Sequence, residues 1–357
     1  MLVSMSNGVE LNSRVCGANE LTEAELSAWE SLCLTQPEHQ RAFLSPHFAC
    51  AVNRARGGVR VCVFERGGEP VGFFPFQFAG ALQAALRAAQ PVGGTMSDAF
   101  GLVACSDMEL SSEQLLAAAG LSVCEVHHLC GAQAEIGLDA EESETGLRVS
   151  FDGGWDAYWE SIAERNKKFV QKTERRCRNI EKEHGPLRLD AALADPRAVL
   201  EDLIARKREQ YARTGAPDAL GESWRRKLLF ELLESEHASC RGALITLHAG
   251  ETWVATHFGL QCGNVLHYWF PVYSQEVSKH SPGHLLLKAV GEQSGALGIA
   301  TVDRGAGDTQ AKRSFANEEQ SFSRGRWSRS GIRSALYGAG CSVGWRLEAL
   351  RGKSQKK

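Results

Sequence analysis

The stretch Ser281–His284 reads Ser-Pro-Gly-His and lies between an aromatic, strand-like run and an apolar, helix-like run. Serine suits the position that caps a helix N-terminus, and proline suits the first helical position, where its missing N–H costs nothing. Gly283 has no Cβ, so a ligand could approach the first-turn amides closely. Free amides at the positive end of a helix bind anions, and Lys279, His280 and His284 add donors or charge. The pattern indicates a phosphate site or, alternatively, only a well-capped helix.

A second polar stretch, "VDRGAGDTQAKRSFAN", follows the next predicted strand. It places Asp303 at the carboxyl end of that strand, where ligands sit in α/β sheets. A glycine loop through Gly305 and Gly307 then leads to Asp308, and Lys312 lies one helical turn further on. Two structural alternatives remain open. Asp303 and Lys312 would form an ion pair, and Asp308 would cap the next helix.

The elements that carry these residues follow from the hydrophobic pattern. Residues 242–273 predict three antiparallel strands, with Gly250 and Gly263 in the tight turns. A helix from Ser281 and a strand at 298–305 follow, and this crossover predicts parallel flanking strands. Strict alternation along the third strand would place His267 and Trp269 on one face, and Tyr268 and Phe270 on the other.

The rest of the chain predicts further helices at 22–35, 155–184, 196–213 and 223–237, and a hairpin at 59–78. This hairpin and the one at 244–261 look alike, which suggests two copies of one α/β unit, although any two antiparallel hairpins share such features. An acidic stretch at 138–146 favours a boundary near residue 150. The predicted organisation is a tail at 1–20, domains at 21–150 and 151–330, and a C-terminal helix with a basic tail at 331–357.

Composition limits the classes of function. The 357 residues are 43% apolar and 23% charged, with a net charge of -3 and a pI near 6.4. This balance predicts no general affinity for nucleic acid and no insertion into membranes. The start lacks the features of a secretory signal, and the 11 scattered cysteines suggest reduced thiols, so we expect a cytoplasmic protein.

Two further stretches invite a functional interpretation. "CEVHHLC" reads as a strand, in which Cys124 and Cys130 would lie roughly 20 Å apart. We therefore predict no metal site there. The helix around "RNKKFVQKTERRCR" carries a basic stripe between Arg165 and Arg178. This stripe is either a solvated face or a docking surface for an anionic ligand.

The motifs together resemble those of a known family. "THFGLQCGNVLHYWFPVYSQEVSKHSPGHLLL" and "GIATVDRGAGDTQAKRSFAN" resemble the CelD/BcsL-like acyltransferases of bacterial cellulose and polysaccharide gene clusters. These belong to the GNAT superfamily and are related to Fem-type transferases. The likeness is strong over residues 155–330 and looser over 20–130. The matching positions are His257, His267, Tyr268, Trp269, Pro271, Tyr273, Ser281, Pro282, Gly283, Asp303, Gly305, Gly307, Asp308 and Lys312.

The resemblance implies an α/β (α+β) fold of two tandem GNAT-like units, each a mixed twisted sheet flanked by helices. The unit at 21–150 would be a degenerate copy, and the unit at 151–330 would be the acetyltransferase domain. It implies an N-acyltransferase that uses acetyl-CoA or another acyl-CoA as co-substrate, with no tightly bound cofactor. The acceptor would be an amine-bearing small molecule or glycan precursor in polysaccharide or surface-glycan biosynthesis.

The resemblance also implies roles for individual residues. The donor would lie between two splayed strands, one of them 265–273, with its pyrophosphate at the helix start. The expected catalytic residues are His267 or His257 as base, Tyr268 or Tyr273 as proton donor, and Asp303 with Lys312. The expected donor-binding residues are Ser281, Pro282, Gly283, His284, Gly307 and Asp308.

Two alternatives to acyl-CoA transfer remain. Fem-type relatives use charged tRNA, so an aminoacyl transferase is one of them. The other is a non-catalytic GNAT-like partner of a synthase complex. Ala311, which stands where the family has tyrosine, and the degenerate pyrophosphate loop keep this possibility open.

Overall fold

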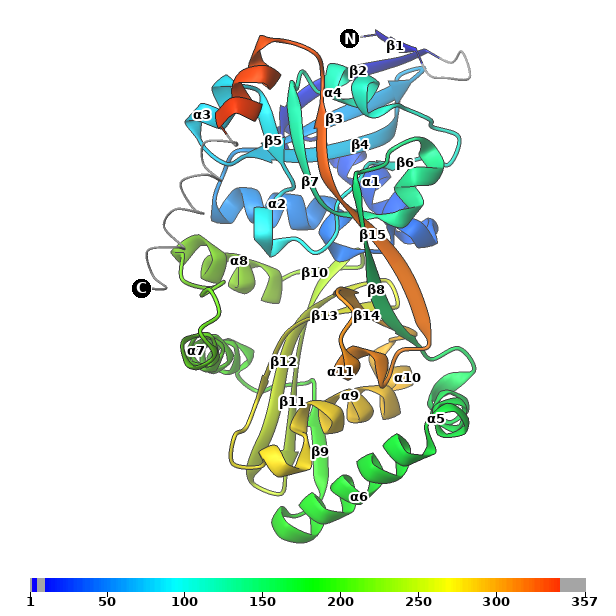
Figure 1. Cartoon of the computed structure of the whole chain (residues 1–357), viewed down its shortest axis with the longest axis vertical. Coiled ribbons are helices and arrows are strands. Elements are labelled where there is room, and N and C mark those ends of the chain that lie inside the picture. The colour runs from blue at the N-terminus through cyan, green and yellow to red at the C-terminus, as the bar shows by residue number, and fades with distance from the viewer. Residues whose placement is uncertain (1, 5–9, 341–357) are drawn as a thin grey trace. The chain divides into compact units, whose positions relative to one another are not determined.

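The computed structural model of the protein describes residues 2–4 and 10–340 (Figure 1). The chain divides into two compact units. Unit 1 takes the described residues of Met1–Leu32, Gly57–Ser143 and Ser323–Lys357, and unit 2 takes Cys33–Arg56 and Glu144–Phe322. Unit 2 therefore combines one long segment, Glu144–Phe322, with a short segment from the first sixth of the chain.

Unit 1 is built on a sheet in which β2, β3 and β4 pair antiparallel. β4 also pairs with β5 and β6, and β5 pairs in parallel with β7. Its elements are β1 (Leu2–Ser4), β2 (Glu10–Gly17), α1 (Glu23–Thr35), β3 (Val59–Arg66), β4 (Glu69–Phe78), α3 (Ala81–Ala85), β5 (Ala88–Gln90), β6 (Val103–Ala104), α4 (Ser112–Ala118) and β7 (Val123–Cys130). The segment 1–20, expected as a tail, instead contains two strands, because β2 buries Leu11 and pairs with β3.

Unit 2 has the strand order β8–β14–β13–β12–β11–β10, with β9 also on β11. β13 and β14 are parallel, and the other pairs are antiparallel. Its elements are η3 (Ala42–Leu44), α2 (Pro46–Ala55), β8 (Glu142–Ser150), α5 (Gly154–Arg165), α6 (Lys167–His184), β9 (Leu187–Asp190), α7 (Pro196–Thr214), α8 (Ser223–Leu233), β10 (Glu236–His237), β11 (Cys240–Ala249), β12 (Thr252–Cys262), β13 (Val265–Tyr273), η6 (Ser278–His280), α9 (Pro282–Glu292), α10 (Ser294–Leu297), β14 (Thr301–Ala306), α11 (Gln310–Arg313) and β15 (Glu318–Ser328). β8 and β15 each continue into unit 1.

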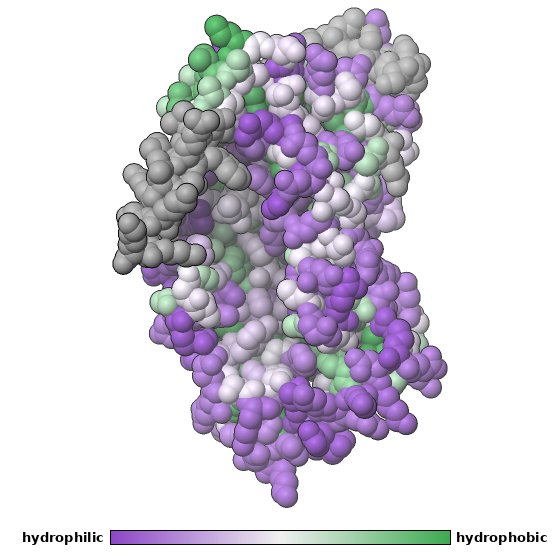
Figure 2. Space-filling view, viewed as in Figure 1, coloured by the Kyte–Doolittle hydropathy of each residue, from purple (hydrophilic) through white to green (hydrophobic). Residues whose placement is uncertain are grey.

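Helices cover both faces of the unit 2 sheet (Figure 1). The single helix predicted over 155–184 is two helices, because Asn166 leaves helical geometry and its side chain accepts the Phe169 amide hydrogen (3.2 Å). α5, α6 and α9 pack on one face in a shared apolar core, and α7 contacts β12 and β13. The outer surface of α6 is strongly hydrophilic, as the purple lower edge of Figure 2 shows.

The predicted α/β class, with two units that each hold a mixed sheet and flanking helices, is confirmed. In the described part of the chain, no helix is both long enough and apolar enough to span a bilayer. Residues 332–340 are helical, as expected for the C-terminal segment. The predicted basic tail, Arg351 to Lys357, lies outside the described residues.

Candidate functional site

The parallel pair β13 and β14 separates partway along its length. The pairing joins Val265–His267 to Thr301–Asp303 and ends there. β13 continues for six more residues, up to Tyr273, without pairing to β14. We call the region bounded by Tyr268–Tyr273 on the β14 side the strand opening. In an α/β sheet, such a departure at the carboxyl ends of parallel strands is a place for a ligand.

A β-bulge in β13 lies at the start of the strand opening. Phe258 pairs with Phe270 and Leu260 with His267, so Tyr268 and Trp269 both lie opposite the single residue Gly259. A Cβ on Gly259 would lie 2.2 Å from the His267 carbonyl oxygen, so only glycine fits there. A bulge of this kind re-aims side chains, and bulges are common beside active sites.

The bulge changes which side chains share a face. By strict alternation, Tyr268 and Tyr273 would point to opposite faces, since they are five positions apart, an odd number. Both pack instead in the core formed with α5, α6 and α9. Trp269 and His267 both contact the Phe43 ring, at centroid distances of 5.2 and 4.5 Å. The extra residue therefore brings two tyrosine side chains together on the α9 side.

His257 fills the bulge as a neutral imidazole. It is fully buried, its ring stacks on Tyr268 at 4.0 Å, and its Nε2 accepts the Trp269 amide hydrogen (3.1 Å). Burial lowers the pKa of His257 to about 3. Because Nε2 is already occupied, Nδ1 carries the proton. This geometry favours a structural role in the bulge over the base role expected for His257.

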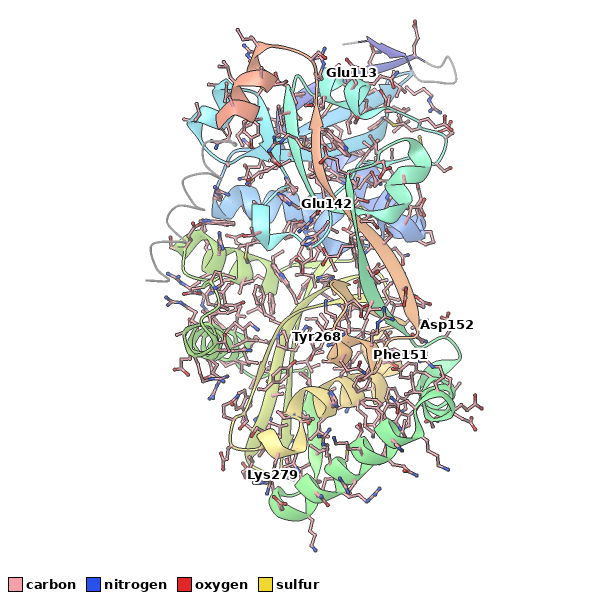
Figure 3. The ribbon with its side chains drawn as sticks, in the orientation of Figure 1. Glu113, Glu142, Phe151, Asp152, Tyr268 and Lys279 are labelled. Carbon is pink, nitrogen blue, oxygen red and sulfur yellow. The ribbon has the colours of Figure 1, made fainter. Side chains whose placement is uncertain are left out.

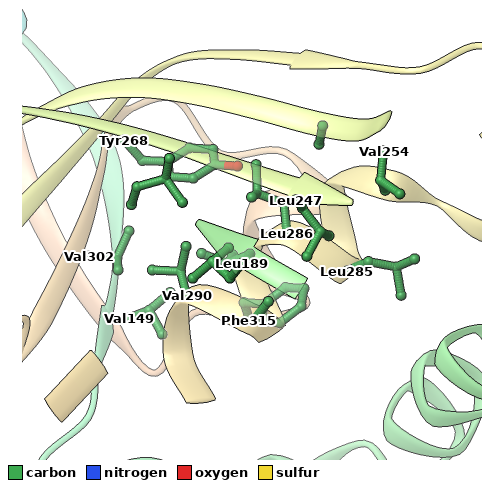
Figure 4. Packing of buried hydrophobic residues seen from close by; sticks show 14 of the residues in the cluster. Val149, Leu189, Leu247, Val254, Tyr268, Leu285, Leu286, Val290, Val302 and Phe315 are labelled. Carbon is green, nitrogen blue, oxygen red and sulfur yellow. The ribbon is translucent and has the colours of Figure 1, made fainter. Parts of the chain in front are cut away.

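The Tyr268 hydroxyl is the buried polar group on this face. The side chain is 8% exposed and lies among aliphatic residues of β14 and α9, such as Val302 and Leu286 (Figures 3 and 4). Its hydroxyl lies close enough to Tyr273 for electrostatic interaction, but no atom within the described residues takes a well-aligned hydrogen bond from it. Burial raises the pKa of both tyrosines, so both stay protonated at neutral pH and can donate a proton.

The start of α9 confirms the predicted helix but not its predicted cap. Ser281 occupies the cap position with φ 54°, and its side chain makes no capping hydrogen bond. Its carbonyl oxygen accepts the amides of His284 (2.8 Å) and Leu285 (3.3 Å). Because Pro282 has no N–H, the Gly283 amide is the one first-turn donor left without a partner in the described chain.

The missing Cβ of Gly283 makes room for a neighbouring side chain. A Cβ there would lie 3.0 Å from the Tyr273 ring, so the glycine makes room for Tyr273. A valine at this position would disturb the packing of that ring as well as any ligand contact. With a single free amide, α9 alone is a weak cradle for a pyrophosphate group.

Positive charge at this place comes instead from side chains. Lys172 and Arg176 of α6 and Arg304 of β14, which we call the basic cluster, all act electrostatically on His284. Burial and these charges lower the pKa of His284 to about 4, so it is neutral at pH 7. Arg304 also lies over the Tyr268 ring, 5.7 Å from its centroid. The positive end of α9 therefore faces additional cations next to the Tyr268 side chain.

Asp303 belongs to a buried polar network. It is 1% exposed and accepts hydrogen bonds from Arg41 (2.6 Å), Gln320 (2.7 Å) and its near neighbour Gly305 (2.8 Å). Burial acts to raise its pKa, but the Arg41 charge and the interaction with His267 outweigh this and lower it. The expected alternative, an ion pair with Lys312, is not formed. Asp303 therefore stays ionised and ties β14 to the segment Cys33–Arg56.

The other predicted residues of the β14–α11 loop have structural partners. Lys312 donates to the Ala306 carbonyl oxygen (2.6 Å), and the Gly307 amide donates to Thr145 (2.8 Å). Asp308 pairs with a neighbouring arginine at 2.5 Å, and the α11 cap is Thr309 rather than Asp308. This loop is therefore closed by its own contacts.

A buried lysine beside β13 was not among the residues predicted from the sequence. Lys207 of α7 is 9% exposed, and its Nζ donates to the Pro271 carbonyl oxygen (3.0 Å) and to Gln210 (3.3 Å). Burial lowers its pKa to about 8. The signal was present in the sequence, because Lys207 continues the apolar stripe of Leu200, Leu203 and Ile204.

The loop before α9 is held to the end of α6. Glu183 contacts the His280 Nε2 (3.2 Å) and the Lys279 ammonium (2.7 Å), and His184 lies beside them. Glu183, His184 and His280 could together surround a cation, but the Lys279 ammonium already pairs with the Glu183 carboxylate. Lys279 marks this end of the unit in Figure 3. The contacts fix the position of the loop that leads into the start of α9.

Comparisons with known proteins agree with this geometry. The sequence profile of the family described as "Acetyltransferase (GNAT) domain" matches residues 167–313, which include β13, α9 and β14. No curated protein sequence matches the chain.

Two solved structures share the fold. The structure of FemX has a TM-score of 0.60 and 12% identity, and the match covers 92% of this chain and 99% of that one. The C-terminal domain of a protein named as a lysylphosphatidylglycerol synthetase from Agrobacterium fabrum has a TM-score of 0.54 and 11% identity, covering 89% and 96%. The specific CelD/BcsL assignment is supported by neither. The chain carries a GNAT acetyltransferase domain in residues 167–313, and its class of activity is that of an acyltransferase.

Proposed function

We propose that the chain is an N-acyltransferase that moves an acyl group from acyl-CoA, with acetyl-CoA as the simplest donor, to an amine acceptor. We place it in polysaccharide or surface-glycan biosynthesis, as its sequence motifs suggest. The observation that carries the proposal is the strand opening, with the protonated Tyr268 hydroxyl buried beside it, close to Tyr273 and without a well-aligned hydrogen bond. A buried donor without a partner costs free energy unless a ligand or reaction state uses it.

The chemistry needs one proton donor and no covalent intermediate. The amine nitrogen attacks the thioester carbonyl, the C–N bond forms and the C–S bond breaks. The departing thiolate takes a proton from Tyr268 or from its neighbour Tyr273. The amine gives its proton to water, because His257 already accepts a hydrogen bond and His267 lies on the Phe43 side of the sheet.

The phosphates of the donor would contact the basic cluster and the Gly283 amide. Charged side chains would supply most of the attraction, since the α9 N-terminus offers a single free amide. The donor would then run from Lys172 and Arg176 towards Tyr268, past the packed pair of Gly283 and Tyr273. Salt should weaken such binding, because screening grows with ionic strength.

Thermal unfolding with and without millimolar acetyl-CoA or CoA tests the donor. A ligand that binds only the folded state at about 100 times its Kd adds roughly 2.7 kcal/mol of stability, so the melting temperature should rise by several degrees. The rise should vanish in a Lys172→Gln/Arg176→Gln variant and persist in Lys182→Gln, which removes an exposed charge elsewhere on α6. No rise for the unmodified protein with either ligand would contradict the acyl-CoA donor.

Aminoacyl transfer from charged tRNA is the second candidate. The match to the structure of FemX over nearly the full length of both chains favours it. The family that the sequence motifs resemble is also related to the Fem-type transferases. Incubation with aminoacyl-tRNA and an amine acceptor would release uncharged tRNA faster than the background rate. If neither donor is bound or consumed, the non-catalytic partner role is the remaining one.

A further inference from the structure

A cavity of about 900 Å³ lies in unit 2 between α7, the β11–β12 turn and the end of β13. We call it the side cavity. Tyr273 lines it and also packs against Gly283 at the start of α9. The cavity therefore shares one residue with the region that we assign to acyl transfer, while Arg304 and the other groups of the basic cluster are not among its lining residues.

The charges around the side cavity favour a cation. Glu209, Glu251 and Glu276 line it, and none of the three has an ion-pair partner among the residues that the structure describes. Two arginines also line it: Arg206 is paired with Asp202 (2.6 Å), and Arg213 offsets one of the three carboxylates, which leaves the lining negative. Exposed carboxylates attract ammonium groups only weakly one by one, whereas several around one concavity raise the local concentration of a cation.

The uncharged lining suits a ligand with hydroxyl groups. Ser274 is 6% exposed and lines the cavity, yet its hydroxyl has no hydrogen bond within the described residues. Gln210 and Gln275 add amide groups of both polarities. Trp253 contributes an aromatic wall, which Arg206 holds by stacking at 3.9 Å and Thr256 by a hydrogen bond from the indole (2.9 Å). A fixed aromatic wall with convergent polar groups is typical of a small-molecule site.

We propose that the side cavity binds the acyl acceptor, and that this acceptor is a hydroxylated primary amine of the amino-sugar class. This inference rests on the proposed acyl transfer, because it names the acceptor of that reaction. The carboxylates hold the ammonium form, and the Ser274 and glutamine groups bind ring hydroxyls against Trp253. The amine, once neutral, lies next to Tyr273 and the strand opening.

Isothermal titration of the full chain with glucosamine, without any donor, tests the inference directly. We expect saturable binding that weakens at least tenfold in a Glu209→Gln/Glu276→Gln variant and at high salt. Ser274→Ala should weaken binding severalfold without loss of stability, because this hydroxyl makes no hydrogen bond in the free protein. The matched control Glu160→Gln, an exposed residue of α5 outside the cavity, should bind as the unmodified protein does.

Three ligands sharpen the outcome. N-acetylglucosamine lacks the ammonium and should bind at least tenfold more weakly than glucosamine. If spermidine bound as tightly as glucosamine, the proposal that the acceptor is an amino sugar would be overturned. If the Glu209→Gln/Glu276→Gln variant bound glucosamine as tightly as the unmodified protein, the proposed site would be overturned. Because no donor is present, these results stand apart from the donor test. If acetyl-CoA raised the melting temperature but glucosamine did not bind, the proposed acyl transfer would stand and this acceptor site would be wrong.

Discussion

The two units use the same order of elements around a parallel strand pair but fill the space beside it differently. In unit 1, β5 and β7 pair at Ala88–Ala89 and Val123–Cys124, and Phe100 then bridges to Leu129 in parallel. In unit 2, no bridge within the described residues rejoins β13 and β14 after His267. The first pair is closed by backbone hydrogen bonds, and the second is left open.

The side chains follow the same division. Beside the closed pair, Phe74, Phe76 and Phe100 pack at centroid distances of 5.6 to 6.0 Å in an apolar core. Beside the open pair lie Tyr268 and His257, with buried polar atoms that have no hydrogen-bond partner in the described residues. An apolar core stabilises the fold without supporting a reaction, whereas unpaired buried donors cost stability and support chemistry.

The helices that follow these strands differ at their starts as well. α4 has a reciprocal cap, in which the Ser111 hydroxyl accepts the Gln114 amide and the Gln114 side chain accepts the Ser111 amide. α9 has a serine in the same position without any side-chain cap. We propose that unit 1 serves as a scaffold and that the proposed acyl transfer belongs to unit 2.

The largest effect on stability should come from removing a buried side chain from the apolar core beside β5 and β7 in unit 1. Phe74→Ala removes a fully buried ring and should cost about 3–5 kcal/mol of unfolding free energy. Urea titration followed by fluorescence measures this loss. The transfer rate of the protein that remains folded should not change, and a fall in that rate would contradict a purely structural role for this core.

Buried charge should give the next effect, because Lys207 is buried without a charged partner, unlike Glu25 in unit 1. Glu25 of α1 in unit 1 is paired with Arg14, whereas Lys207 of α7 has only neutral partners. The folded state releases the Lys207 proton near pH 8, and the unfolded state near 10.5. Between these values the unfolded state binds more protons, so stability should rise with pH, by roughly 3 kcal/mol in total.

Denaturant titrations at pH 7.5, 9 and 10.5 would measure this rise. In Lys207→Met the rise should be absent, because no buried ammonium remains. Lys182→Gln, which changes an exposed lysine, should keep the full pH dependence. Equal slopes for all three proteins would mean that Lys207 is not the group responsible.

Removing the Tyr268 hydroxyl beside the strand opening should lower the rate of acyl transfer rather than the stability of the protein. Tyr268→Phe should slow acyl transfer about 100-fold, equivalent to about 2.7 kcal/mol. The unfolding free energy should change by less than about 0.5 kcal/mol, since the hydroxyl has no aligned hydrogen bond to lose.

The converse change provides the control for this experiment. Phe74→Tyr adds a hydroxyl to the apolar core of unit 1 and should cost about 1–3 kcal/mol of stability while leaving the rate intact. If Tyr268→Phe kept full activity in single-turnover assays, Tyr273 would be the proton donor. If the Tyr268→Phe/Tyr273→Phe variant were also active, a tyrosine donor would be ruled out.

The smallest difference should appear at the two helix starts. Ser111→Ala should destabilise the protein by about 1 kcal/mol, because it breaks a reciprocal cap. Ser281→Ala should change stability by less than about 0.5 kcal/mol, because its side chain caps nothing. Melting temperatures of both variants side by side would show this, and equal losses would mean that Ser281 has a capping role in solution.

Local signals predicted the fold well. The strands at 242–273, the helix at Ser281 and the crossover to β14 follow from turn glycines and apolar runs, and all are present. The break at Asn166 was missed because the basic residues on both sides continue a helical pattern. The bulge in β13 was also not predicted, because strict alternation does not allow for an extra residue. Gly259 was the only sequence signal of the bulge.

The site was less predictable because its contacts are distant in sequence. The start of α9 was named from residue types and spacing, and the tyrosines were named from the resemblance to a known family. Arg41, however, lies 262 residues from its partner Asp303, and nothing in either stretch indicates the pairing. The packing of the Tyr273 ring over Gly283 could not be predicted either, because the two are ten positions apart and no local pattern links them.

The bulge in β13 has a consequence for how such a domain changes over evolutionary time. Because one inserted residue decides which side chains share a face, loss of a single codon between those for His267 and Phe270 would exchange the tyrosine surface for another set of side chains. No substitution could do this in one step. A one-residue deletion variant of this protein would display that alternative arrangement.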